Sequence, residues 1–263
     1  MTTATAHVRP VALVTGASSG IGYEIVKIFA REGYDVVVVA RDADRLEKLA
    51  EECRSFGAGA TVIAKDLSVL SSAQEIYDTL QSSEIQVDVL VNNAGLGTHG
   101  SFISIPMDMD LHLLQVNIVA LTQLTKLFLP GMVARGRGRI LNVASLAAFQ
   151  AGPLMATYFA SKAYVLYLSE ALAQEVAGTG VTVTAFCPGP VRTEFRARAG
   201  SEGKPTVGSP IDAETAAWAA YRGMMRGKRI VIPGFKGKLS AAVVRFFPRS
   251  WVTWAAGKLN KVD

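Results

Sequence analysis

Tyr158 and Lys162 are the residues whose types and spacing most directly predict chemistry. They stand four positions apart in a helical pattern, so both side chains lie on one helical face. A free tyrosine, with a pKa near ~10, is a poor base at neutral pH, but a neighbouring ammonium stabilises the phenolate and lowers that pKa. Such a pair can exchange a proton with a substrate oxygen. Ser145, 13 residues earlier at the end of an apolar run, can hydrogen-bond the same oxygen.

A glycine-rich segment near the N-terminus predicts a phosphate-binding turn. Gly16, Gly20 and Gly22 follow the apolar run Val11–Thr15 and precede a helical pattern. These glycines permit a tight turn, a close approach of the backbone to a pyrophosphate, and close helix–strand packing, and a helix N-terminus attracts anions. The alternative is an ordinary glycine-containing turn between a strand and a helix. The other residues expected to contact phosphate here are Ser18, Ser19 and Ile21.

Short Val- and Ile-rich runs alternate with longer helical patterns along the chain. This alternation predicts an α/β fold with one doubly wound (Rossmann-type) domain: a parallel sheet of about seven strands with helices on both faces. We divide the chain into a flexible N-terminus (1–9), a catalytic domain (10–234) and a basic, apolar C-terminal extension (235–263). The expected strands are 11–15, 35–40, 61–65, 88–92, 139–145, 181–187 and 229–233, and the expected helices are 20–31, 42–55, 71–83, 108–134, 157–177 and 212–226.

The motifs together resemble the classical short-chain dehydrogenase/reductase family. Asn92–Gly95, Asn117, Ser145, the Tyr158–Lys162 pair and Pro188–Gly189 follow the glycine turn in family order over residues 11–234. The resemblance implies a nicotinamide-dependent oxidoreductase in which Tyr158 is the acid/base. Lys162 then also binds the nicotinamide ribose, and Asn117 holds a water that connects Lys162 to solvent. The further cofactor contacts implied are Leu67, Asn93, Ala94, Gly95, Pro188, Gly189, Val191 and Thr193.

Each of these residues also has a purely structural interpretation. Tyr158 and Lys162 could be solvated on a helix surface, Asn117 could join a helix to a loop, and Ser145 could cap a strand. The alternative function is a non-catalytic dinucleotide-binding sensor or scaffold on the same fold, because a fold does not prove an activity. A sensor is expected to lose Tyr158 or Lys162, whereas this chain keeps both.

The end of the second expected strand predicts which nicotinamide cofactor binds. An NAD site usually has an acidic residue there, but this chain has Ala40 followed by Arg41. Ala40 removes a repulsive carboxylate and Arg41 can pair with a 2′-phosphate, so NADP (NADPH) is favoured over NAD. The alternative is a solvated Arg41 that pairs with Asp42 or Asp44. Asp66 resembles the family residue that binds adenine, and its alternative role is to cap the next helix.

The expected substrate contacts are Ser145, Phe149, Leu154 and Tyr158. Their apolar surroundings favour a lipophilic ketone, a 3-oxoacyl compound or a steroid-like molecule, reduced at a carbonyl or oxidised at a secondary alcohol. His99 is expected to hydrogen-bond within its loop. No metal site is expected.

The net charge of +5 belongs to the C-terminal extension, because residues 236–263 hold six Lys or Arg and one Asp. No basic patch of recognisable nucleic-acid-binding geometry appears, so no nucleic-acid partner is expected. The extension either packs on the substrate pocket or a subunit boundary, which we favour, or contacts a membrane peripherally. Packing predicts burial of Leu239, Val243, Phe246, Phe247, Trp251 and Trp254.

Assembly and compartment follow from composition and resemblance. The expected helix 157–177 carries more apolar surface than one sheet can cover, which with the resemblance predicts a homodimer or homotetramer through it and helix 108–134. Cys53 and Cys187 are far apart and in no CxxC pair, which indicates reduced thiols. Residues 1–10 have no apolar signal-peptide core, and polar residues interrupt the uncharged stretch 140–161, so a cytoplasmic protein is expected, with possible peripheral membrane contact.

Overall fold

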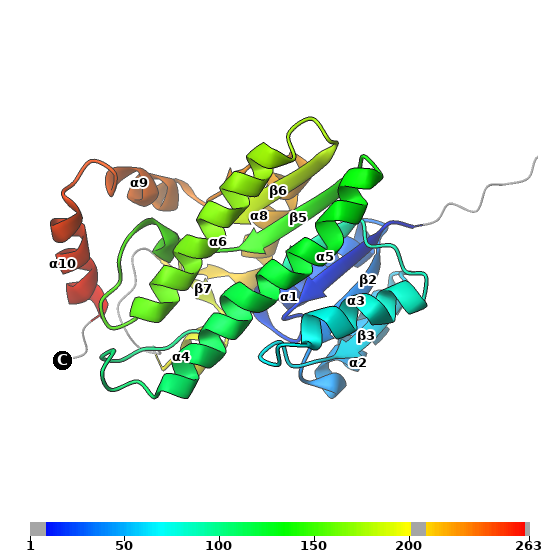
Figure 1. Cartoon of the computed structure of the whole chain (residues 1–263), viewed down its shortest axis with the longest axis horizontal. Helices are drawn as coiled ribbons and strands as arrows, with labels where there is room; N and C mark the ends of the chain where they lie inside the picture. The colour runs from blue at the N-terminus through cyan, green and yellow to red at the C-terminus, as the bar shows by residue number, and fades with distance from the viewer. Residues whose placement is uncertain (1–8, 201–208, 261–263) are drawn as a thin grey trace, which may run out of the picture.

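The seven predicted strands form one sheet in the order β3-β2-β1-β4-β5-β6-β9 (Figure 1). The structure is a computed structural model that describes residues 9–200 and 209–260, so most of the expected flexible N-terminus lies outside the described residues. Every pairing in this sheet is parallel, which confirms the doubly wound fold. The strands are β1 (Val11–Thr15), β2 (Asp35–Ala40), β3 (Ala60–Ala64), β4 (Val89–Asn92), β5 (Gly138–Val143), β6 (Val181–Phe186) and β9 (Ile230–Val231).

Helices cover both faces of this sheet (Figure 1). Three helices pack on one face: α1 (Gly20–Arg31), α2 (Ala43–Ser55) and α8 (Ala213–Met225). The other face is covered by α3 (Ser72–Ser82), α5 (Leu121–Ala134) and α6 (Ala156–Glu175). Because both faces are covered, the strands carry near-continuous apolar runs rather than an alternating pattern, as in the run DVVVVA of β2.

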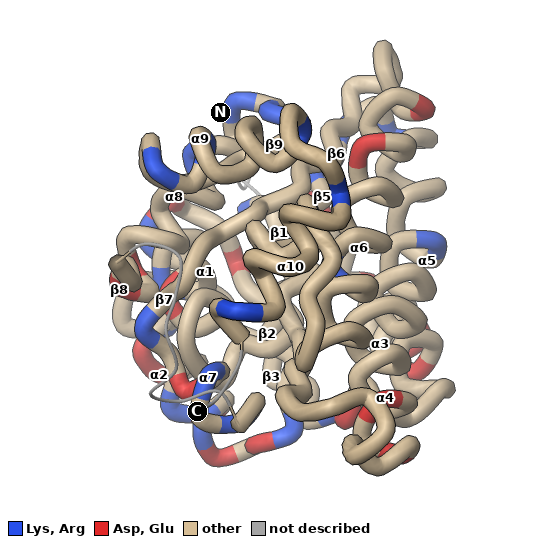
Figure 2. Tube along the Cα trace, turned by 90° about the vertical axis from the view of Figure 1, so that its left-hand side faces the viewer, with Lys and Arg blue, Asp and Glu red and all other residues tan. Residues whose placement is uncertain are grey.

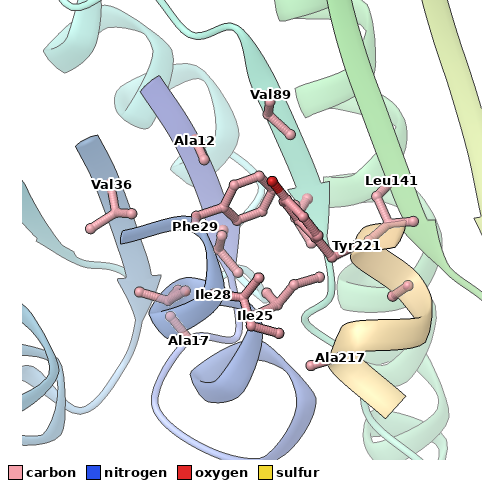
Figure 3. Packing of buried hydrophobic residues seen from close by; sticks show 14 of the residues in the cluster. Ala12, Ala17, Ile25, Ile28, Phe29, Val36, Val89, Leu141, Ala217 and Tyr221 are labelled. Atoms are coloured by element: carbon pink, nitrogen blue, oxygen red, sulfur yellow. The ribbon is translucent and has the colours of Figure 1, made fainter. Parts of the chain in front are cut away.

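The core between α1, α8 and the sheet fixes the helix that starts at the glycine turn. Phe29 of α1 is fully buried and meets the ring of Tyr221 of α8 edge-on, with 5.3 Å between centroids (Figure 3). Ile25 and Ile28 fill the same layer, which gives α1 one apolar face. Aromatic pairs of this geometry stabilise a core by ~0.5–1.5 kcal/mol beyond the area they bury. The packing therefore holds the N-terminus of α1 at the carboxyl edge of the sheet.

The long helix expected over 108–134 is interrupted in the middle. It consists of α4 (Met107–Leu114), a π-helical segment η1 (Gln115–Ala120) and α5. The combined stretch Met107–Ala134 is long and apolar enough to cross a membrane. However, Leu124, Phe128 and Met132 of α5 are buried against the sheet, as in the core helix of a globular domain.

Short elements complete the carboxyl edge of the sheet. They are a 3₁₀ turn η2 (Leu146–Phe149), a strand pair formed by β7 (Val191–Arg192) and β8 (Ile211–Asp212), and helix α7 (Phe195–Arg198). The C-terminal extension forms two short helices, α9 (Phe235–Val243) and α10 (Arg249–Asn260). Both lie on the left in Figure 1, beyond the carboxyl end of β5.

The expected burial of the large apolar side chains in the extension is wrong for this chain. The two helices turn small residues inward, Ala241 and Ala256, which are 6% and 3% exposed. The larger residues consequently lie on the outside. The exposed residues are Leu239, Val243, Phe246, Phe247, Trp251 and Trp254.

Candidate active site

A cavity of about 800 Å³ lies along the carboxyl ends of the strands. It extends from the glycine turn and the end of β2 to Tyr158 and the inner side of α9 and α10. All but three of the predicted site residues line it. The exceptions are Gly22, Asn117 and Leu154.

The glycine turn has the geometry that its spacing predicts. Gly16 and Gly20 have φ values of 65° and 60°, in the left-handed region that favours glycine. A Cβ on Gly22 would lie 2.3 Å from the Gly16 carbonyl oxygen, so Gly22 serves the close packing of α1 against the turn. The Ser19 side chain makes no cap hydrogen bond to α1. The first N–H groups of a helix lack partners within the helix, so the start of α1 offers donors at the cavity.

Thr15 and Asn93 join this turn to the end of β4. The Thr15 hydroxyl accepts hydrogen bonds from the backbone N–H groups of Asn93 and Ala94, at 3.0 and 3.1 Å. The Asn93 amide donates to the carbonyls of Thr15 and Gly16, at 2.9 and 3.1 Å. Asn93 therefore holds the turn as well as lining the cavity. The sequence analysis did not identify Thr15, although a threonine at a strand end before a glycine was a usable signal.

Arg41 and Asp66 flank the cavity where β2 and β3 end. Arg41 Nη1 lies 4.0 Å from Asp66 Oδ2, so the arginine approaches Asp66 rather than Asp42 or Asp44. Arg41 is 63% exposed and therefore available to a ligand. Burial raises the pKa of Asp66, but hydrogen bonds from Ser68 and the charge of Arg41 outweigh it, so the pKa is lowered. The carboxylate is ionised at neutral pH and accepts from Ser68 N–H at 2.9 Å.

Tyr158, Ser145 and Lys162 meet on one wall of the cavity. Tyr158 and Lys162 project from successive turns of α6, and Lys162 Nζ lies 5.9 Å from the Tyr158 ring centroid. Lys162 Nζ also donates to the Val143 carbonyl at 2.8 Å. Ser145 follows β5, accepts from Ala147 N–H at 3.1 Å and hydrogen-bonds to Tyr158. Ser145 thus caps η2 and contacts Tyr158, and its hydrogen bond to a substrate oxygen stays a prediction.

Burial dominates the proton equilibria at this wall. It raises the pKa of Tyr158 to about 12, against the opposing hydrogen bond from Ser145. Burial also lowers the pKa of Lys162 to about 8. The expected lowering of the tyrosine pKa by Lys162 is therefore not found in the protein alone. At neutral pH Tyr158 keeps its proton and can donate it.

Asn117 lies in the π-helical segment η1 and is 1% exposed. Its Oδ1 accepts from Leu96 N–H at 2.8 Å, and its Nδ2 donates to the Leu96 carbonyl and the Ser161 hydroxyl, at 2.9 and 3.0 Å. A Cβ on Gly95 would lie 3.4 Å from both Asn117 Oδ1 and Lys162 Nζ, so the two groups flank the same glycine. The water-binding role of Asn117 stays a prediction.

The substrate side differs from the prediction at Leu154. Its backbone has a φ of 64° and its carbonyl accepts from Gly100 N–H at 2.8 Å, and the residue does not line the cavity. Met155 lines the cavity in its place, together with Phe149. The left-handed turn at Leu154 gave no signal in the sequence, because non-glycine residues rarely adopt it.

Further side chains that the sequence analysis did not name contribute apolar surface to the cavity. Phe195 of α7 lies 5.5 Å from the Tyr158 ring, centroid to centroid, and Phe159 lies 6.0 Å from it. The extension adds Val244 and Leu259 to the cavity wall. The hydrogen bond of His99 leaves its own loop: its Nε2 lies 2.9 Å from the Asn260 carbonyl and joins the loop after β4 to α10.

These residues fit a nicotinamide dinucleotide phosphate. The uncapped start of α1 suits a pyrophosphate, and the exposed Arg41 guanidinium at the far end suits a terminal phosphate. Lys162 and Tyr158, at the other end of the same cavity, suit the nicotinamide ribose. No acidic side chain occupies position 40, where a carboxylate would favour a free ribose.

Comparison with known proteins gives a consistent result. A family model described as short chain dehydrogenase matches residues 10–203. The chain is 33% identical over 254 residues to the oxidoreductase UcpA of Salmonella typhimurium, which covers 96% of this chain and 92% of that relative. It is 37% identical over 188 residues, 71% of this chain, to a short chain dehydrogenase of Pseudocercospora fijiensis, and the match spans 61% of that relative's length.

Solved structures agree with the sequence matches. A short-chain dehydrogenase from Sphingobium yanoikuyae in complex with NADPH has a TM-score of 0.81 at 31% identity, covering 97% of this chain and 96% of that one. The bulky-bulky ketone specific alcohol dehydrogenase from Comamonas testosteroni has a TM-score of 0.79 at 30% identity, covering 93% and 94%. Family model, relatives and shared architecture together show that this chain belongs to the short-chain dehydrogenase/reductase family of oxidoreductases.

Proposed function

We propose that this protein is an NADP(H)-dependent reductase of a bulky, apolar ketone or 3-oxoacyl compound. The observation that carries the proposal is the meeting of Tyr158, Ser145 and Lys162 on the wall of the cavity that begins at Arg41. When bound there, the nicotinamide cofactor supplies hydride transfer. The remaining requirements, which are to orient the carbonyl and to deliver a proton to its oxygen, fall to this chain's own residues.

Tyr158 is the proton donor in this proposal. Its pKa of about 12 keeps the hydroxyl protonated at neutral pH. Ser145, already hydrogen-bonded to Tyr158, holds the same carbonyl oxygen and aligns it with the tyrosine proton. Lys162, fixed by Val143, presents an ammonium beneath the ring that stabilises the phenolate left after proton donation. In these roles the three residues serve the reduction of a carbonyl.

The substrate class is proposed from the apolar wall. Phe159 and Phe195 lie beside the Tyr158 ring, and Phe149, Met155, Val244 and Leu259 line the same cavity. These apolar side chains offer contacts to the groups on both sides of a carbonyl. The bulky-ketone specificity of the Comamonas enzyme supports the same class.

The test is NADPH consumption measured against a panel of small ketones, bulky aryl ketones, 3-oxoacyl thioesters and sugars. We expect turnover of the bulky apolar carbonyls and none of the sugars. The matched variant is Tyr158→Phe, which removes the proton but keeps the ring contacts with Phe195. Proton donation contributes roughly 10²–10⁴-fold, so kcat should fall by that factor while the Kd of NADPH stays within about twofold. Full activity of Tyr158→Phe, or turnover of sugars alone, refutes the proposal.

A further inference from the structure

The outer face of the C-terminal extension carries large apolar side chains that no described part of the chain covers. Phe235, Leu239 and Val243 follow one another at helical spacing along α9 and are 77%, 51% and 39% exposed. Trp251 and Trp254, three positions apart on α10, are 65% and 68% exposed. Phe246 and Phe247 in the connection between the two helices are also exposed. A contiguous exposed apolar surface of this kind marks a contact with something outside the chain.

The same surface carries only positive charge. Residues 235–260 contain five Lys or Arg and no Asp or Glu. Figure 2 shows these basic positions in blue along α9 and α10, with no acidic position between them. Within the described ranges 9–200 and 209–260, no ion pair involves them. The five are Lys236, Lys238, Arg245, Arg249 and Lys258.

The inner face of the extension is a separate surface. Ala241 and Ala256 are buried, and Val244, Leu259 and Asn260 line the cavity. Asn260 also donates to the Pro153 carbonyl at 2.9 Å, which ties the end of α10 to the loop before α6. Each helix is therefore anchored by its small residues and presents its aromatic residues outward. The outer face is free to bind a partner without moving the cavity wall.

A shallow groove on α10 is lined by two cations, Arg249 and Lys258, and by Ser250 and Trp254. Lys258 Nζ lies 5.8 Å from the Trp254 ring centroid, so a cation and an indole stand side by side. Cations beside an indole suit the boundary between lipid headgroups and acyl chains, because the ring is apolar while its N–H and the ammonium remain in contact with polar groups.

We propose that the outer face of α9 and α10 docks this protein on an anionic lipid surface. The aromatic side chains enter the headgroup region, and the five cations pair with lipid phosphates. A second copy of the chain is a poorer occupant, because a two-fold interface would bring two all-basic surfaces together with no acid between them. Docking places the side of the cavity formed by the extension against the membrane. This proposal does not depend on the reaction proposed above.

Vesicle binding by the full chain tests this directly. The probes are vesicles of phosphatidylcholine alone and vesicles with about one third phosphatidylglycerol, since anionic lipid is the required partner. We expect co-sedimentation with the anionic vesicles only, and release at about 1 M salt, where the Debye length is about 3 Å. Lipids with brominated acyl chains should quench the tryptophan fluorescence of the bound protein. Absence of binding to anionic vesicles overturns the proposal.

A charge variant and its matched control separate binding through this surface from a general effect of net charge. Lys236→Gln/Lys238→Gln/Arg245→Gln should weaken binding about a hundredfold, at about fivefold for each basic residue. Three exposed lysines elsewhere, in Lys48→Gln/Lys126→Gln/Lys228→Gln, provide the control, which should bind within a few-fold of the parent. Equal losses in both triple variants would mean that net charge alone drives binding, and the docking surface would be wrong.

The aromatic variant distinguishes lipid from a subunit contact. Trp251→Ser/Trp254→Ser should lose co-sedimentation with anionic vesicles and leave the molar mass in light scattering unchanged. Trp218 on α8 remains in this variant as an internal reference for folding. A lower molar mass in the variant would assign the face to a second copy of the chain and overturn the proposal.

Discussion

Arg41 controls the choice between NADPH and NADH if the cofactor lies as proposed, and the structure sets the size of the effect. A charge-assisted hydrogen bond to a 2′-phosphate contributes roughly 1.5–3 kcal/mol. Arg41 must give up its approach to Asp66, but at 4.0 Å and with both side chains exposed that pair is worth about 0–1 kcal/mol. Subtracted from the middle of the first range, this loss leaves NADPH a net advantage of about 1–2 kcal/mol, or roughly 5–30-fold in Kd.

The perturbation is Arg41→Ala, measured as the Kd of NADPH and of NADH by calorimetry or by quenching of protein fluorescence. We expect the Kd of NADPH to rise about 5–30-fold and the Kd of NADH to stay within about twofold. Arg54→Ala is the control, because Arg54 is an exposed arginine of α2 that pairs with Glu47 and does not line the cavity. An unchanged ratio of the two affinities in Arg41→Ala would show that another group reads the 2′-phosphate, or that none does.

Three further outcomes follow from the structure. Burial lowers the pKa of Lys162 from its ordinary value of 10.5 to about 8, so between these pH values the unfolded state binds more protons than the folded state. The wild type should therefore gain up to about 3 kcal/mol of unfolding free energy relative to Lys162→Met as pH rises through that range. Urea midpoints of the two proteins that stay parallel from pH 8 to 10 would contradict this. Gly22→Ala places a Cβ 2.3 Å from the Gly16 carbonyl oxygen, so in thermal melts it should lower the free energy of unfolding by roughly 1–3 kcal/mol, and it should also weaken cofactor binding. The control is Gly131→Ala, whose Cβ meets only the tip of Arg135 and which should leave the stability unchanged in the same melts. Tyr167 of α6 is 68% exposed on the helix expected to pair with another copy, so light scattering should give a dimer or tetramer that Tyr167→Arg dissociates; a monomeric wild type at micromolar concentration would refute the assembly.

The fold was predictable because its elements carry strong local signals. The run DVVVVA of β2 and the apolar face of α1 lie where their patterns place them. Strand ends shift by one or two residues, as at β5, which ends at Val143 rather than Ser145. The π-helical interruption at Asn117 was not predictable, because the apolar pattern of 107–134 continues through it.

The members of the candidate site were predictable by type, but their states were not. Tyr158, Lys162 and Ser145 were chosen from spacing and order, and the structure brings them together. The direction of the Tyr158 pKa was wrong, because spacing reports the neighbouring ammonium and not the burial that raises this pKa. Leu154 was assigned to the substrate side by its apolar type alone, and a left-handed backbone excludes it.

By itself, the sequence determined the alternation of strands and helices, the glycine turn, the Tyr158–Lys162 spacing and the basic, aromatic composition of the extension. These are local properties, since they depend on residue type and on neighbours within a few positions. Only the tertiary structure decided which side of the extension faces the cavity. Ala241 and Ala256 pack inward because small residues let the helices approach, and the tryptophans are left outside with the positive charge. That outcome depends on contacts between segments about 100 residues apart, such as Asn260 with Pro153, which no local pattern records.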